Sequence, residues 1–144
     1  MMTDDTRLLL EECESGCKMA VQSMKQVEEY IKDKDLLDKV VNCRKEHERL
    51  GERTKDLLKE AQEPTKEPPK MASTMSWITT EMKLMVNAEN HQIAKIMMDG
   101  CNMGIQSVSE YLNKFTTADS RASELARDIV DVEERFMKEM KHYI

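Results

Sequence analysis

The sequence is poor in the residues that build turns and sheets. Its 144 residues include only 4 Gly and 3 Pro, and the aromatic residues number 1 Trp, 3 Tyr and 2 Phe. A sheet protein needs more turn formers and more aromatic or β-branched residues than this. The composition therefore predicts an all-α protein. A chain of this length fits a single domain, residues 1–144, with a core that needs no metal or disulfide to support it.

Long apolar runs and basic stripes are also absent. No apolar run approaches the roughly 18 residues of a membrane-spanning helix. The opening residues, MMTDDTRLLLEECE, are acidic where a signal peptide is basic. Charges of both signs are interspersed, the net charge is −6, and no basic patch carries interleaved aromatic residues. We therefore expect a soluble, cytoplasmic protein that binds neither membrane nor nucleic acid.

Sequence motifs for catalysis are lacking as well. The chain contains no Gly-rich phosphate loop and no Ser or Cys nucleophile at a strand-to-helix turn. The adjacent acids Glu133 and Glu134 point to different helix faces, and we interpret them as solvated surface. The four cysteines match no disulfide framework or zinc motif, so we expect free thiols.

Apolar residues recur at alternating spacings of three and four, the pattern of a helix with one buried face. The first hairpin, residues 3–62, holds two such helices. Thr3, Asp4 or Asp5 can cap the first helix, and Asp35 with Asp38 is predicted to form a capping box for the second. The short connection makes the two helices antiparallel. The predicted buried stripes are Leu10, Cys13, Cys17, Ala20, Met24, Val27 and Ile31, then Val40, Cys43, His47, Leu50, Thr54, Leu57 and Ala61.

A proline-rich break separates this hairpin from a second one. The stretch QEPTKEPPK, residues 62–70, contains all three prolines and ends the helix before it. The crossover, 63–88, then carries a short amphipathic helix with Met71, Met75, Ile78, Met82 and Met85 on one face. The second hairpin, 89–144, has a helix that begins at about Glu89 and a last helix capped by Thr117 or Asp119. Its predicted stripes are Ile93, Met97, Cys101, Gly104, Val108, Tyr111 and Phe115, then Ala122, Leu125, Ile129, Val132, Phe136 and Tyr143.

One octet occurs twice: GCKMAVQS at 16–23 returns as GCNMGIQS at 100–107. Five of eight positions are identical, and the same offset of 84 residues aligns the two core stripes. We interpret this as an internal duplication of a helix hairpin. Small residues at Gly16, Ala20, Gly100 and Gly104 are predicted to let the two helices approach closely. On this interpretation, Gly16→Leu or Gly100→Leu should overpack the contact and destabilise the protein by roughly 1 to 3 kcal/mol.

Two hairpins joined by a long crossover resemble the ferritin-like fold. The fold predicted is thus an all-α, ferritin-like four-helix bundle of two duplicated hairpins. More narrowly, MSWITTEMKLM, DGCNMGIQSVSEYLNKF and VEERFMKEM resemble small uncharacterised ferritin-like bundle proteins of anaerobic gut Firmicutes. This resemblance implies a fold and a source, and it implies no reaction.

Ferritin-like bundles often hold two irons through Glu and Glu-x-x-His ligands. Here only Glu139 and His142 have that spacing, while the residue three before His47 is Arg44. The acids Glu12, Glu14, Glu28 and Glu110 are placed beside the core stripes rather than on them. We therefore predict no cofactor. The alternative is a site for Zn(II) or Cu(I), with di-iron a poorer fit, built from thiol and imidazole ligands at Cys13, Cys17, Cys43, His47 and Cys101.

The predicted function is non-catalytic, through self-association as a homodimer or through a helical protein partner. The predicted crossover helix carries a second, partly apolar strip at Trp77, Glu81 and Leu84, beside its methionine face. A single layer of bundle offers no cover for this strip. The competing prediction is a metal-binding or redox protein that uses the core Cys and His residues.

Overall fold

A computed structural model describes residues 2–60 and 87–144, and this part of the chain is helical without strands. Four long helices form a bundle: α1 (Asp4–Glu28), α2 (Lys34–Glu60), α4 (Asn90–Lys114) and α5 (Ser120–Met140). A short 3-10 turn, η1 (Lys141–Tyr143), follows α5. The all-α four-helix prediction is confirmed. The predicted short helix at 71–85 lies outside the described residues.

Local hydrogen bonds start each helix where a polar side chain satisfies a free backbone N–H group. Thr3 accepts from the Thr6 N–H, Asp119 accepts from the Ala122 N–H, and Glu89 forms a capping box with Gln92. The predicted capping box of Asp35 with Asp38 is wrong. Asp33 accepts from the Leu36 N–H at 2.8 Å instead, because α2 begins at Lys34, one residue earlier than Asp35.

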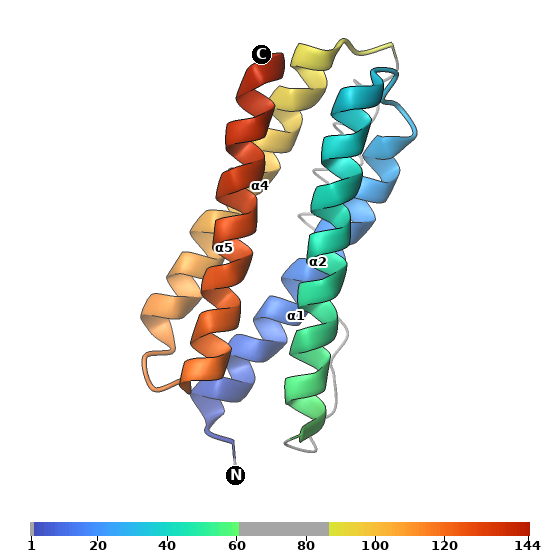
Figure 1. Ribbon diagram of the computed structural model, residues 1–144. Helices are drawn as coiled ribbons and strands as arrows, with labels where there is room; N and C mark the ends of the chain where they lie inside the picture. The colour runs from blue at the N-terminus through green and yellow to red at the C-terminus, as the bar shows by residue number, and fades with distance from the viewer. Residues whose placement is uncertain (1, 61–86) are drawn as a thin grey trace.

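Figure 1 shows the direction of the helices. The α1 and α5 helices run one way along the bundle, and α2 and α4 run the other way. Each hairpin is thus antiparallel, and α2 ends at the opposite end of the bundle from the start of α4. This order of directions is the one that a crossover between two hairpins requires.

Buried side chains from all four helices form one core. The predicted stripes are largely buried, including Cys13, Val27, Leu50 and Phe136, but Leu58 replaces Leu57 in α2. A straight α-helix has about 3.6 residues per turn, whereas a strict heptad pattern assumes about 3.5. Over a long helix, the buried position therefore shifts by about one residue relative to the heptad pattern. Predicted stripe residues that stay partly exposed are Ala20, Leu57, Gly104, Tyr111, Phe115 and Tyr143; Ala61 lies outside the described residues.

Ion pairs join α2 to α5 along their exposed edges. Such pairs contribute about 0 to 1 kcal/mol each, so they help to set the register of the two helices more than the stability of the bundle. They are Arg53 with Asp128, Arg121 with Glu60, Arg135 with Glu46 and Lys39 with Glu139. On the opposite side of the bundle, a cavity lies between α1 and α4.

Candidate functional site

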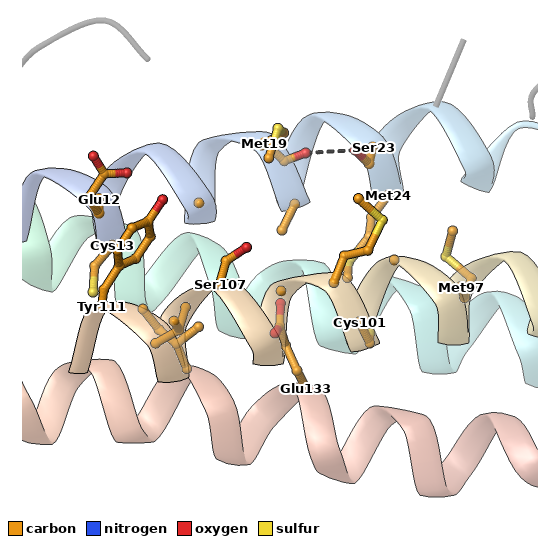
Figure 2. A pocket seen from close by; sticks show the side chains of 17 residues that line it. Glu12, Cys13, Met19, Ser23, Met24, Met97, Cys101, Ser107, Tyr111 and Glu133 are labelled. Atoms are coloured by element: carbon orange, nitrogen blue, oxygen red, sulfur yellow. Dashed lines mark hydrogen bonds between the residues drawn. The ribbon is translucent and has the colours of Figure 1, made fainter. Parts of the chain in front are cut away.

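The cavity lies between α1 and α4, with α5 as its floor, and its volume is about 230 Å³ (Figure 2). We call it the α1–α4 cavity. Both copies of the repeated octet line it with the same four positions, which fall on one face of each helix. These residues are Gly16, Met19, Ala20 and Ser23 on α1 and Gly100, Met103, Gly104 and Ser107 on α4. The repeat therefore marks the two walls of a cavity.

The predicted close approach of the helices at Gly16 is wrong. A Cβ atom added at Gly16 would meet no atom within 4 Å. At Gly104 an added Cβ would lie 2.5 Å from a carboxylate oxygen of Glu133, which belongs to α5. The small residues leave space on the facing sides of α1 and α4, and part of that space is occupied by an acid from a third helix.

The two glycines give a matched pair of stability predictions. Gly16→Ala is expected to raise the free energy of unfolding by about 0.5 to 1 kcal/mol, because alanine favours a helix over glycine and has room there. Gly104→Ala is expected to lose that gain, since its methyl group collides with the Glu133 carboxylate. Urea unfolding of both variants beside the parent measures the difference. Equal effects at the two sites would contradict this assignment of the cavity walls.

Glu133 is the buried acid of this cavity. It is 7% exposed and rises from α5 between the two walls (Figure 2). Oε1 lies 3.4 Å from His47 Nε2, whereas Oε2 has no hydrogen-bond partner among the described residues. A buried acceptor without a donor costs about 1 to 3 kcal/mol. The interpretation of Glu133 as solvated surface is therefore wrong, although Glu134 is exposed.

A signal for Glu133 is present in the sequence. Glu133 follows Ile129 by four residues and precedes Phe136 by three, so it occupies the apolar stripe of α5. Glu14 is a second buried acid: its side chain is 1% exposed, and Lys18 Nζ lies 3.2 Å from Oε1. The prediction that Glu14 lies beside the core is therefore wrong. An acid at a stripe position is a stronger indication of a site than the pairing of acids in sequence.

His47 connects α2 to Glu133 through the centre of the bundle. The ring is 1% exposed. Nδ1 lies 2.9 Å from the Cys43 carbonyl oxygen and 3.6 Å from Cys43 Sγ, while Nε2 faces Glu133. A proton on Nε2 can be donated to the carboxylate. On its other side His47 lines a second cavity, of about 420 Å³ between α1 and α2, with Glu14, Cys17 and Gly51.

All four cysteines are buried and form no disulfide, as predicted. Burial raises the pKa of Cys13 to about 12. Burial likewise raises the pKa of Cys17 and of Cys43, with smaller contributions from nearby thiols and acids, and that of Cys101, to which Glu133 adds. The reactive form of cysteine is the thiolate. The four thiols therefore stay protonated at neutral pH and are poor nucleophiles.

The structure brings the proposed metal ligands together only in part: after burial, Cys101 adds most to the raised pKa of Cys43, and Cys13 adds most to that of Cys17. Cys43 and His47 are in contact, and Cys13 and Cys101 both line the α1–α4 cavity. Cys17 lies on the side of α1 that faces the second cavity. Across residues 2–60 and 87–144, no group of three or more His, Cys, Asp and Glu side chains is arranged to hold a metal ion. The partner strip at Trp77, Glu81 and Leu84 lies outside the described residues.

Comparison with known proteins identifies the fold. No protein-family model matches the chain, and no curated protein matches it. The chain is similar in structure to a DUF305 fragment from Deinococcus radiodurans, with a TM-score of 0.75 over 98% of this chain and 95% of the other. The two sequences are only 13% identical, so the likeness concerns the helical bundle alone. No helix in the described ranges is both long and apolar enough to span a membrane.

Proposed function

We propose that this four-helix bundle is a non-catalytic protein that acts by binding, with the α1–α4 cavity as its binding site. The cavity itself carries the proposal. Ligand sites in proteins are concave and mostly apolar, with a few polar groups that orient the ligand. Methionine, cysteine and small residues form most of these walls, and Glu133 is the buried polar group. The protonated thiols support a binding role over nucleophilic catalysis.

Methionine methyl groups provide the test. Met19, Met24, Met97 and Met103 line the cavity, whereas Met137 and Met140 lie on α5 and are not among its lining residues. In spectra of protein labelled at the methionine methyl carbons, n-hexanol should shift the first four signals and leave the last two unchanged. Gly16→Leu projects a side chain into the cavity and should abolish these shifts while the protein stays folded. Hexanol that shifts none of the four signals would contradict the proposal.

Association with a protein is a separate part of the proposal. A homodimer or a complex with a helical protein would use the strip at Trp77, Glu81 and Leu84. We also propose that the two hairpins arose by duplication within a ferritin-like fold. The proposal further places the protein in gut Firmicutes and in the cytoplasm. Light scattering of the parent beside Trp77→Ala addresses self-association. A mass of one chain at all concentrations for both proteins would remove the homodimer.

Soft-metal binding is the alternative function, and the contact between Cys43 and His47 is the observation that favours it. Thiolate and imidazole are ligands for Zn(II) and Cu(I). Elemental analysis of untagged protein, purified without oxygen or chelators, separates the two functions. About one zinc or copper ion per chain would favour the metal site, and the thiols would then be protected from titration until a chelator is added.

A further inference from the structure

We infer that the ligand of the α1–α4 cavity is an apolar amine, held through its ammonium group by the Glu133 carboxylate. The inference rests on the proposed function and adds a chemical class to it. Three observations carry it: the sign of the charges in the cavity, the unpartnered oxygen of Glu133, and the size and composition of the walls.

The charge of the cavity is negative. Among the described residues that line it, Glu12 and Glu133 are acidic and none is Lys or Arg. Glu12 lies beside the hydroxyl of Tyr111 and, after burial, is the main cause that raises the pKa of that hydroxyl. Glu133 is different, since His47 occupies Oε1 from the side of α2 and Oε2 remains without a donor. A ligand of the cavity would therefore supply the missing hydrogen-bond donor to Oε2 of Glu133.

An ammonium group is the donor that best matches this oxygen. Hydrogen bonds between a charged donor and a carboxylate are about twice as strong as those between neutral groups. The gain is larger in a site removed from water, where the carboxylate has lost much of its hydration. A carboxylic acid or phosphate ligand would instead place a second negative charge beside Glu133.

The residues of the cavity walls determine the size and polarity of the rest of the ligand. Four methionines and two cysteines give a flexible, polarisable apolar surface. An apolar cavity of about 150 Å³ binds benzene, so a cavity of about 230 Å³ accommodates a chain or ring of somewhat larger size. An aliphatic or aromatic amine of about six to eight carbons fits this description.

Three probes of equal length test the charge preference: hexylammonium, n-hexanol and hexanoate. Calorimetric titration of the full chain should show hexylammonium binding at least about tenfold more tightly than hexanol, with hexanoate the weakest. Glu133→Gln keeps the shape of the side chain and removes its charge. In this variant the affinity for hexylammonium should fall to that for hexanol, while hexanol binds as before.

A matched control is Glu134→Gln, which removes one negative charge from the exposed neighbouring position. It should leave the preference for hexylammonium intact. Equal affinities for hexylammonium and hexanol in the parent, or a preference that survives Glu133→Gln, would overturn the inference and leave the proposed function in place. If none of the three probes shifts the cavity methionines, the proposed function itself fails.

Discussion

Replacing His47 by leucine is expected to lower the free energy of unfolding by about 3 kcal/mol, because it leaves the buried Glu133 carboxylate without its hydrogen-bond donor, and that cost is larger for a charged group than for a neutral one. His47 Nε2 lies 3.4 Å from Oε1 of Glu133, and Oε2 of Glu133 has no hydrogen-bond partner among the described residues. Without the ring, the carboxylate stays buried with neither oxygen satisfied. Urea unfolding monitored by circular dichroism measures the change.

The double variant His47→Leu with Glu133→Leu makes the prediction specific. It replaces both polar groups by apolar side chains, which is often neutral or stabilising for a buried pair. The double variant should therefore be more stable than His47→Leu alone, and Glu133→Leu alone should cost less than His47→Leu because a neutral imidazole is cheaper to leave unpaired than a carboxylate. Additive effects in this double-mutant cycle would show that the two residues do not interact.

Phe136→Ala is expected to cost a similar amount, about 3 to 5 kcal/mol, because a large buried side chain leaves a cavity that the bundle fills only in part. Phe136 is 1% exposed and lies on the core face of α5. Ile144, which is 57% exposed, provides the control. Ile144→Ala should change stability by less than about 0.5 kcal/mol. A loss below about 1 kcal/mol for Phe136→Ala would contradict the position of α5 in the core.

Much of the fold follows from local patterns. The alternation of three and four residues located all four described helices, and the caps at Thr3 and Asp119 were among the predicted ones. The errors have local causes too. The cap of α2 is Asp33 rather than Asp35, because several acids in this segment can cap and sequence spacing does not decide among them. The buried residue is Leu58 rather than Leu57 because a straight helix has about 3.6 residues per turn, more than a heptad pattern assumes.

The site depended on relations between helices. The octet repeat was visible in the sequence, but small residues on two helices are compatible with close packing and equally with a cavity. The choice depends on how far apart the other helices hold α1 and α4, which no local pattern specifies. In the structure, the strong contacts run from α1 to α2, from α2 to α5 and from α5 to α4, and the fourth side of the bundle remains open enough for a cavity.

The sequence by itself determined the helical class, the two hairpins and the identity of most core positions, because these depend on residue periodicity and on the hydrophobic effect within each helix. Only the tertiary structure decided that Glu133 meets His47, 86 positions away in the chain. The tertiary structure also decided that Glu133 lines an apolar cavity and that its second oxygen is buried beside Gly104 without a donor among the described residues. Such a contact is decided by the packing and rotation of three helices about a shared core. The chemistry of the binding site is therefore a property of the bundle as a whole.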